Sequence, residues 1–392
     1  GRPSNTFGVG NDDAFIVKFN AACTRIWATY YGGTSNDNAY GCTTDGSGNV
    51  YIIGRTSSTS GIANLGHQNA CGGDTDAYIV KFNAAGIRQW ASYYGGSYTD
   101  DALCCATDNN GNVFMAGITS SLTGITTAGC HQSPFGGGSR DGFLVKFNST
   151  SGARIWGTYY GGNVEDRITS CTIDNSDNIY IAGTTNSING IATTGGHQPN
   201  LMATSGSPDA FLAKFSSTGT RLWSTYYGDL STNGFSCATD LNGNVYLSGQ
   251  TYGYIGIATS LAFQTNNAGG GPDAFLVKFT AGGARLWGTF YGGIGTDYGY
   301  SCATDAMGNV YLAGNTSSNT NISYNGYQNA FGGDNDAFLV QFNSSGTSRL
   351  WATYIGGTGN EFFPDIALQQ NGDIYIRTYF FNSQYCHPKW FR

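Results

Sequence analysis

Residues 273–314, DAFLVKFTAGGARLWGTFYGGIGTDYGYSCATDAMGNVYLAG, form the block of sequence that decides the fold. Related blocks recur along the 392 residues, and the tryptophan of an Arg-x-Trp motif marks each copy: Trp27, Trp90, Trp156, Trp223, Trp287 and Trp351. Successive tryptophans lie 63, 66, 67, 64 and 64 residues apart. A fixed period of this size is the signature of a repeat architecture. The chain is therefore predicted to consist of six equivalent structural units.

Each repeat contains four candidate strands, as the second copy illustrates. Residues 77–82 and 88–94 are rich in β-branched and aromatic residues and flank a Gly-containing turn, which indicates a hairpin. A second hairpin covers residues 103–107 and 112–117, because the Asn-Gly turn between them supplies the positive φ angles that a tight hairpin needs. Four antiparallel strands per repeat predict an all-β protein, a six-bladed β-propeller.

No compositional break interrupts the repeat, so residues 1–392 are predicted to form a single propeller domain with an irregular tail at 379–392. The repeat cores are expected near residues 13–54, 76–117, 141–183, 209–249, 273–314 and 336–378.

The repeated pattern DAFLVKF…RLWGTYYGG…SCATD…GNVYLAG resembles the SBBP family of bacterial β-propeller repeats, and the resemblance extends from Asn11 to about Thr378. Its second half is also similar to NHL-type propeller repeats. The resemblance implies that the Cys-x-x-Asp strand is innermost, followed by Asn-Val-Tyr, Asp-Ala-Phe and, outermost, Arg-x-Trp. The chain then begins with the outer half of a blade and ends with the inner half. Residues 364–378 are therefore expected to join residues 13–31 in a shared closing blade that leaves no exposed sheet edge.

Charge and composition restrict the partners. The net charge is −7, charged residues make up 11% of the chain, and 11 of the 18 Lys and Arg residues fall in two repeat columns. Cations spread once per repeat do not form a phosphate-tracking patch, so nucleic acid is not an expected partner. No stretch approaches the roughly 20 apolar residues that cross a bilayer, so membrane insertion is not expected. Abundant Gly, Ser, Thr and Asn favour a secreted or cell-surface bacterial protein.

Several repeated columns are predicted to be structural. The Trp and Arg of each Arg-x-Trp motif occur in all six copies, as does an aspartate column: Asp13, Asp76, Asp141, Asp209, Asp273 and Asp336. A binding or catalytic site that occurs once in the protein needs such a residue in one repeat only, so repetition in all six copies indicates a structural role. A cysteine column, Cys42, Cys105, Cys171, Cys237 and Cys302, has Ile366 as its sixth member and is predicted to be buried, since free Cys behaves as a small hydrophobe. Cys71 and Cys130 lie in corresponding loops and are a candidate disulfide pair.

The candidate ligand-binding residues lie on two kinds of loop that should share one rim: the long connection from second to third strand, and the crossover between blades. They are Asp37, Asp100, Asp166, Asp297, Glu361, His67, His131 and His197. The acidic residues either ring the axial opening or cap the crossover backbone. Aromatic residues replace the histidines in later copies, which indicates packing of a flat ring. Neighbouring blades would hold the histidines too far apart for a shared zinc ion, so no metal site is predicted.

Standard catalytic signatures such as G-x-S-x-G, H-E-x-x-H and the P-loop are absent from the sequence, so no catalytic residue and no cofactor is predicted. The leading hypothesis is a non-enzymatic binding or scaffolding module that presents rim loops to carbohydrate or protein partners at the bacterial surface. Two alternatives stay open: a structural or assembly subunit without a small ligand, and a lyase or glycoside hydrolase that acts over the axial opening.

Overall fold

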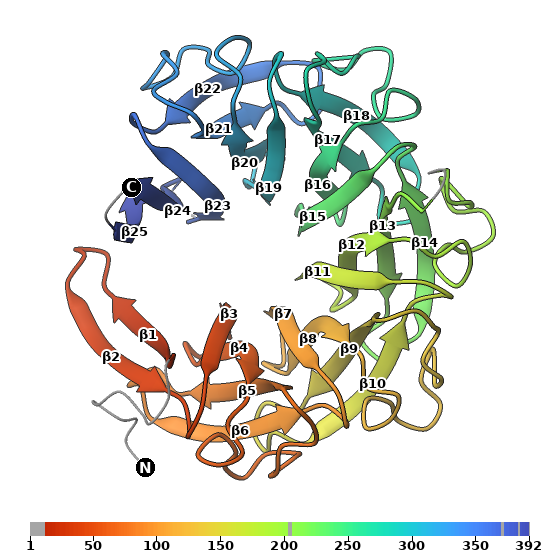
Figure 1. Ribbon diagram of the computed structural model, residues 1–392, viewed down its shortest axis with the longest axis vertical. Helices are drawn as coiled ribbons and strands as arrows, with labels where there is room; N and C mark the ends of the chain where they lie inside the picture. The colour runs from red at the N-terminus through yellow and green to blue at the C-terminus, as the bar shows by residue number, and fades with distance from the viewer. Residues whose placement is uncertain (1–11, 203–205, 370–371, 383–384, 392) are drawn as a thin grey trace. The chain divides into compact units, whose positions relative to one another are not determined.

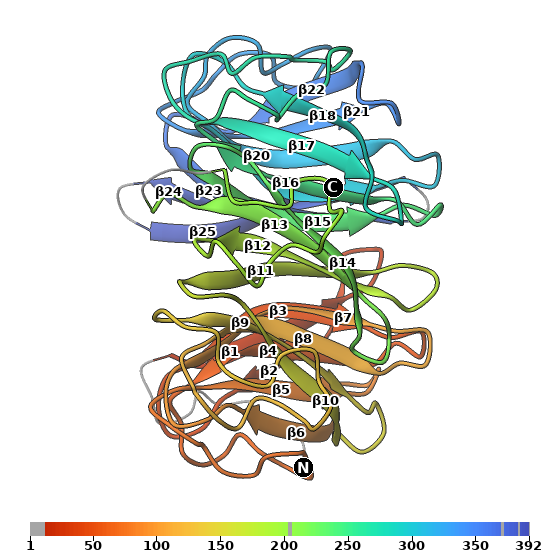
Figure 2. The same cartoon turned by 90° about the vertical axis from the view of Figure 1, so that its right-hand side faces the viewer.

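The computed structural model describes residues 12–202, 206–369, 372–382 and 385–391. These residues form 25 strands joined by turns and loops (Figures 1 and 2), which confirms the all-β prediction. In this part of the chain, no helix is long and apolar enough to cross a membrane. The contacts divide the chain into two compact units. Unit 1 holds Gly1–Ile173, Asp177–Ile179 and Phe215–Arg221, and unit 2 holds Asp174–Ser176, Tyr180–Lys214 and Leu222–Arg392.

Among the described residues, five sheets each consist of four antiparallel strands in sequence order, as the repeat predicts. They are Asp37–Thr44 (β3), Val50–Thr56 (β4), Asp76–Phe82 (β5) and Arg88–Tyr94 (β6); Asp100–Thr107 (β7), Val113–Thr119 (β8), Asp141–Phe147 (β9) and Arg154–Tyr160 (β10); Asp166–Ile173 (β11), Ile179–Thr185 (β12), Asp209–Phe215 (β13) and Arg221–Tyr227 (β14); Thr232–Thr239 (β15), Val245–Thr251 (β16), Asp273–Phe279 (β17) and Arg285–Tyr291 (β18); Asp297–Thr304 (β19), Val310–Thr316 (β20), Asp336–Phe342 (β21) and Arg349–Ile355 (β22).

The turn between β7 and β8 shows why each first hairpin forms. Gly111 has a φ of 76° and donates its N–H to the Asp108 carbonyl at 2.9 Å. The Asp108 carboxylate accepts the N–H groups of Asn110 at 3.0 Å and Asn112 at 2.8 Å. An Asp that binds the backbone of its own turn, followed by a glycine in the left-handed region, is a strong turn signal.

The first strand of each complete sheet begins earlier than the sequence predicts. In β7 the strand starts at Asp100, three residues before the predicted Leu103. The strand pairing between β7 and β8 is irregular between Ala102 and Cys104, which leaves Leu103 as the extra residue of a β-bulge. A bulge interrupts the alternation of inward and outward side chains. The alternation pattern therefore failed to identify the residues ahead of the bulge as strand.

The two ends of the chain form shorter sheets. Among the described strands, Ala14–Phe19 (β1) pairs only with Arg25–Tyr31 (β2), whereas Asn360–Leu368 (β23), Ile374–Asn382 (β24) and Tyr385–Phe391 (β25) form a three-stranded sheet. The predicted irregular tail is thus wrong for the described part of 379–392, because β24 continues to Asn382 and β25 follows it. In the structure, β25 occupies the edge of β24 that the shared closing blade would assign to β1. The pairing of the two ends is therefore still a prediction.

Within each unit, the first strands of successive sheets converge. In unit 1 β3 contacts β7 and β7 contacts β11; in unit 2 β15 contacts β19 and β19 contacts β23. The second and third strands carry the core between sheets, with Met115, Phe143 and Val145 fully buried in unit 1. These strands are covered on both faces, which explains their near-continuous apolar runs. The innermost position of the Cys-x-x-Asp strand follows from this convergence.

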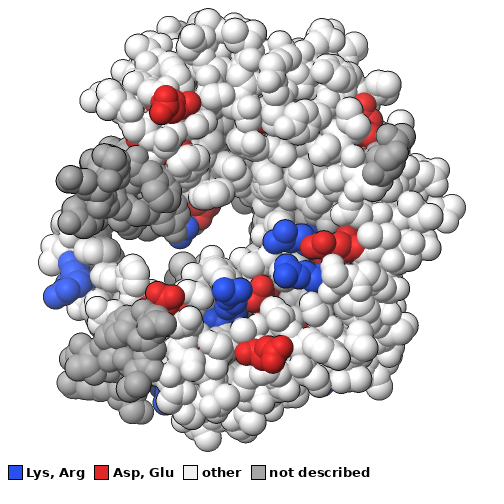
Figure 3. Space-filling model, in the orientation of Figure 1, with Lys and Arg blue, Asp and Glu red and all other residues white. Residues whose placement is uncertain are grey.

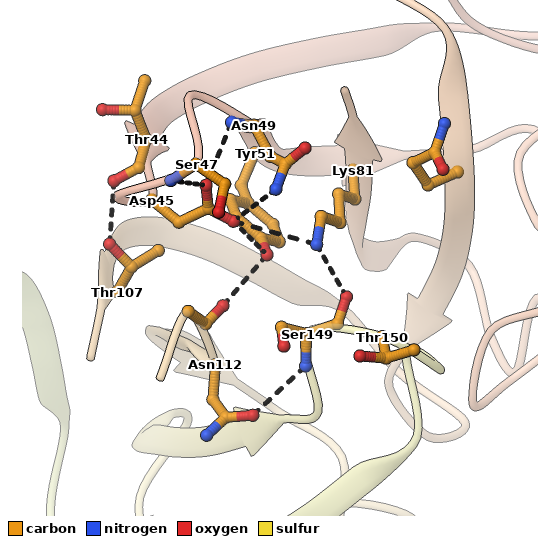
Figure 4. A network of polar contacts seen from close by, with 12 residues as sticks. Thr44, Asp45, Ser47, Asn49, Tyr51, Lys81, Thr107, Asn112, Ser149 and Thr150 are labelled. Atoms are coloured by element: carbon orange, nitrogen blue, oxygen red, sulfur yellow. Dashed lines mark hydrogen bonds and ion pairs between the residues drawn. The ribbon is translucent and has the colours of Figure 1, made fainter. Parts of the chain in front are cut away.

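A repeated polar network connects neighbouring sheets (Figure 4). Lys81 of β5 is only 8% exposed, and its Nζ lies 3.8 Å from Oδ2 of Asp45 and donates to the Ser149 carbonyl at 2.8 Å. The Nζ also lies 5.3 Å from the ring centroid of Tyr51. Equivalent ion pairs join Lys146 to Asp108, Lys214 to Asp174 and Lys278 to Asp240 at 2.8, 3.0 and 3.0 Å. The lysine column is therefore structural.

The tryptophan column completes this connection. Trp156 of β10 is 8% exposed, and its Nε1 donates to the Ser217 carbonyl at 3.1 Å. Its ring packs edge-on against Phe114, with centroids 5.8 Å apart. A Cβ added to Gly219 would lie 2.9 Å from the same ring, so glycine is required in that turn. The predicted packing role of this tryptophan is confirmed.

Candidate functional site

The aspartates at the crossovers between successive sheets have side chains that are buried within the crossover loops. Asp100, at the start of β7, is completely buried; its Oδ2 accepts the Gly96 N–H at 2.9 Å and the Ser121 hydroxyl at 2.8 Å, and Thr119 donates to Oδ1. Burial raises the pKa of Asp100 to about 6 despite these donors. Asp37 and Asp297 accept equivalent bonds, from Gly33 and Ser58 and from Gly293 and Ser318 respectively. Through these hydrogen bonds, the three aspartates cap the backbone of the crossover loops.

The other two acidic candidates are also buried. Asp166 is 0% exposed and its Oδ2 accepts the Gly162 N–H at 2.7 Å. Glu361 is 2% exposed, and its backbone N–H bonds to the Asn335 carbonyl at 2.9 Å. A ligand at the surface would not reach carboxylates in these positions. A ligand-binding role for this acidic column stays a prediction.

The structure does not bring the three candidate histidines together. Each ring lies beside the aromatic residue of a nearby strand: His67 is 6.4 Å from Phe147, His131 is 5.4 Å from Phe215 and His197 is 5.8 Å from Phe279. Burial, with a smaller effect of the Arg221 charge, lowers the pKa of His131 to about 4. Among the described residues, no group of three His, Cys, Asp or Glu side chains could hold a metal ion.

The cysteine predictions have mixed outcomes. Cys237 and Cys302 are buried at 6% exposure, as predicted for the repeat column, but Cys42 is exposed. The candidate disulfide is wrong, because Cys71 and Cys130 are both free thiols. The Cys71 Sγ lies 3.3 Å from the Gly73 carbonyl, so this thiol is engaged within its own loop. Corresponding places in two repeats do not bring two Cβ atoms within bonding range.

The long loops are held by a glutamine that the sequence analysis did not select. After His67, Gln68 donates from Nε2 to Oδ2 of Asp76 at 2.9 Å, and the Gly72 N–H bonds to the same oxygen at 2.8 Å. In the fifth repeat, Gln264 and Ala268 bind Oδ2 of Asp273 in the same way. The His-Gln pair therefore orders the loop against the start of the third strand. The recurrence of Gln at all five positions was the available signal.

An aromatic ladder crosses three first strands of unit 2, and the sequence analysis did not find it. Phe235 of β15 stacks on Tyr300 of β19, with centroids 5.1 Å apart and planes 25° apart. Tyr300 contacts Phe363 of β23 at 5.2 Å and stacks on Tyr298 at 5.6 Å. Phe363 is 55% exposed, and the other three rings are half-buried. We call Phe235, Tyr298, Tyr300 and Phe363 the aromatic ladder.

The bulges create this ladder. Phe235 and Tyr300 are the extra residues at the irregularities of β15 and β19, and Phe363 lies in that of β23. The equivalent extra residues in unit 1 include Tyr40 and Leu103, which form no such stack among the described residues. Bulges redirect side chains and are common next to functional sites.

Asn315 holds the last ring of the ladder in place. Phe363 has a φ of 51°, which a non-glycine residue adopts only when its surroundings enforce it. The Phe363 N–H bonds to Oδ1 of Asn315 at 2.8 Å, and Nδ2 of the same side chain donates to the Glu361 carbonyl. Asn315 is 3% exposed, and the matching position is Arg55 in the first complete sheet and Gln250 in the fourth repeat. Among the five complete sheets, asparagine stands at this position only in β20.

The ladder offers partly exposed ring edges for apolar contact, and Phe363 is its most accessible ring at 55% exposure. Aromatic rings contribute large contact areas at low entropic cost, and Tyr adds a hydroxyl. Beyond Phe363 on β23, the exposed Asp365 accepts the Ser301 hydroxyl at 2.8 Å. Most of the face shown in Figure 3 is formed by uncharged residues, in keeping with 11% charged residues in the chain. Recognition at the ladder would therefore depend on aromatic contacts and on hydrogen bonds, including bonds to the Asp365 carboxylate.

Comparison with known proteins supports the repeat assignment. Residues 26–61 match the SBBP beta-propeller repeat family, which confirms the resemblance noted in the sequence. The chain is 23% identical over 95% of its length to an uncharacterized WD repeat-containing protein, L264, of Acanthamoeba polyphaga mimivirus, and 24% identical over 85% to the regulatory protein FlaEY of Caulobacter vibrioides. It spans 31% and 35% of the lengths of these two relatives. Among solved structures, a polysaccharide lyase of family PL25, an ulvan lyase, aligns at 9% identity with a TM-score of 0.48, covering 97% of this chain and 92% of that one.

Proposed function

We propose that this protein is a non-catalytic module that binds carbohydrate through the aromatic ladder, assisted by the loops at the strand ends. The observation that carries this proposal is the run of ring contacts from Phe235 through Tyr300 to Phe363 across three neighbouring strands. A row of half-exposed rings matches the apolar C–H faces of successive sugar units in a chain. Stacking of this kind needs no charge, which suits a protein with few charged side chains.

A polysaccharide suits the ladder better than a protein partner. Stable protein interfaces bury about 800 Å² on each side, around apolar anchors that a polar rim surrounds. The ladder is instead a short run of four rings beside the exposed Asp365, whose carboxylate can accept bonds from sugar hydroxyls. Separately from the ladder, the long loops carry exposed tyrosines, Tyr254 at 66% and Tyr327 at 100%.

An enzymatic role has less support from the geometry. Glycoside hydrolysis needs two carboxyl groups that flank the scissile bond. The closely placed carboxyl groups of this protein, such as Asp141 and Asp166, are 0% exposed and recur in most repeats. A substrate cannot reach them without opening the loops that they hold together.

We further propose that the protein is a closed, six-bladed propeller, with β23 and β24 completing the sheet that β1 and β2 begin. Phe15 and Phe19 of β1 are 64% and 55% exposed, whereas Phe143 and Phe147, which hold the same places in β9, are completely buried. A hairpin with this much exposed aromatic surface lacks its inner strands. β23 and β24 match the first two strands of a repeat, and closure requires β1 to take the place beside β24 that β25 holds in the described residues.

The composition supports a location outside the cell, where a polysaccharide ligand would be met. Fractionation of cells that express the full-length protein tests this location. Recovery of the protein from the cytoplasm only would contradict it.

Binding of a panel of soluble polysaccharides, measured by affinity electrophoresis and a glycan array, tests the proposed function. We expect Tyr300→Ala to weaken binding at least about tenfold, equivalent to about 1.4 kcal/mol, because the central ring of the ladder is lost. Tyr40→Ala is the matched control, since Tyr40 is 42% exposed at the equivalent bulge of unit 1. Absence of binding to every polysaccharide, or equal binding by a folded Tyr300→Ala variant, would refute the proposal.

A further inference from the structure

One boundary between successive sheets of unit 1 brings two cysteines together. Cys104 lies on β7 and Cys171 on β11, the first strands of two neighbouring sheets that contact each other. The two side chains are half-buried thiols, and a hydrogen bond joins them. The structure thus places two oxidisable groups in contact across a boundary between sheets, although they are 67 residues apart in the sequence.

The alternation of side chains along β7 explains why Cys104 faces β11. Its neighbour Cys105 packs against the hydrophobic core that contains Tyr51 of β4 and Met115 of β8. Successive side chains of a strand point to opposite faces of the sheet. Cys104 therefore points away from that core, toward the sheet that begins with β11. Its Sγ also lies 3.8 Å from the Ala116 carbonyl oxygen of β8.

The matching boundary in unit 2 shows how close the two strands come. Ser236 of β15 and Cys302 of β19 hold the equivalent positions, with Oγ of Ser236 3.7 Å from Sγ of Cys302. The same Oγ accepts the Cys302 N–H at 3.2 Å. Adding about 2.4 Å from Oγ to its own Cα and about 1.5 Å from N to Cα puts the two Cα atoms at most about 7 Å apart. Disulfides join residues whose Cα atoms are about 4.4–6.8 Å apart, so this boundary lies in disulfide range.

The sequence offers two thiols at this boundary alone. At the other boundaries between successive repeats, the equivalent positions hold a residue other than cysteine on the first strand: Gly41 with Cys105, Ser170 with Cys237, Ser236 with Cys302 and Ser301 with Ile366. Serine occupies the place of Cys104 in three of these four pairs. Packing at this position therefore does not require a thiol.

We propose that Cys104 and Cys171 form a disulfide in an oxidising environment, which ties β7 covalently to β11. A small disulfide such as oxidised glutathione is the oxidant. The thiolate of one cysteine attacks it, expels one glutathione thiolate and forms a mixed disulfide; the second cysteine then displaces the other glutathione. Two S–H bonds are lost and one S–S bond forms. The two protons pass to solvent, and the two electrons reduce the oxidant to two glutathione thiolates.

The bridge closes a loop of 67 residues, and a cross-link of this kind stabilises a protein mainly by restricting the unfolded chain. The hydrogen bond with Cys104, together with burial, raises the pKa of the Cys171 thiol. Because exchange requires a thiolate, the bridge should close faster as the pH is raised. The inference is independent of carbohydrate binding. An oxidising location outside the cell, as proposed above, is one in which disulfides persist.

Refolding from urea in a glutathione redox buffer at about pH 8.5, where thiolate is available, tests the inference. Alkylation and mass spectrometry of non-reduced peptides then identify the linked cysteines. We expect a linked Cys104–Cys171 peptide and a Tm at least about 3 °C higher than in reductant. Cys104→Ser should fold, since serine is natural at this position, but lose the linked peptide and the response of Tm to reductant. Cys105→Ala is the matched control and should keep both.

A gained bridge tests the same geometry from the other side. Ser236→Cys places a second thiol beside Cys302, so this variant should form an additional disulfide in unit 2. Three results would overturn the inference. They are a refolded wild type in which Cys104 and Cys171 remain thiols, a linkage of Cys171 that survives Cys104→Ser, and a folded Ser236→Cys variant without a bridge to Cys302, because the 3.7 Å contact is the geometric basis of the proposal.

Discussion

Trp156 and Gly219 offer a quantitative test of how neighbouring sheets are connected. Trp156→Ala removes a ring that is 8% exposed and the hydrogen bond to Ser217. Such truncations of buried aromatic residues cost about 3–5 kcal/mol of unfolding free energy. Gly219→Ala adds a Cβ 2.9 Å from the ring at a φ of 86°. The left-handed backbone costs about 1–2 kcal/mol for alanine, and the overpacking about 1–3 kcal/mol more.

The two changes should be strongly non-additive. Without the Trp156 ring, the new Cβ meets no aromatic atoms, so Gly219→Ala should cost only the backbone part, about 1–2 kcal/mol. The double-mutant cycle is then expected to give a coupling of about 1–3 kcal/mol. The assay is urea unfolding followed by circular dichroism, which does not depend on tryptophan fluorescence.

A matched control separates backbone strain from the ring contact. Gly256 has a φ of 77° with no atom within 4 Å of its Cβ position, so Gly256→Ala should cost the same in both backgrounds. If Gly219→Ala costs equally in the wild type and in Trp156→Ala, to within about 0.5 kcal/mol, the assigned ring contact is refuted.

Two further predictions concern the closing sheet and a histidine. If β24 pairs with β1 in solution, Phe19→Ala should cost about 3–5 kcal/mol, as Phe147→Ala should; urea unfolding that shows a cost below about 1 kcal/mol for Phe19→Ala alone would refute closure. His131 should titrate near pH 4 in an NMR experiment, because burial lowers its pKa. Since its folded pKa is depressed, its contribution to stability is complete above about pH 6.5 and is lost as the pH falls toward 4; a midpoint near 6.5 would contradict this packing.

The sequence alone determined the repeat, the strands and most of the structural columns. These properties are local, since alternation, turn residues and the spacing of Trp156 and its equivalents depend on short segments that each repeat restates. Six-fold repetition also allowed a structural role to be separated from a functional one, because a site used once does not need a residue in every copy.

Only the tertiary structure decided which side chains from different repeats meet. Phe235, Tyr300 and Phe363 contact one another because bulges turn them toward one another, and the position of a bulge is not specified by a local sequence pattern. The contact of Asn315 with Phe363 spans 48 residues. Likewise, the facing of Asp273 and Asp297 across Gly292 and the separation of Cys71 from Cys130 depend on how one sheet is placed against the next. Distances between repeats are set by packing, which a one-dimensional pattern does not encode.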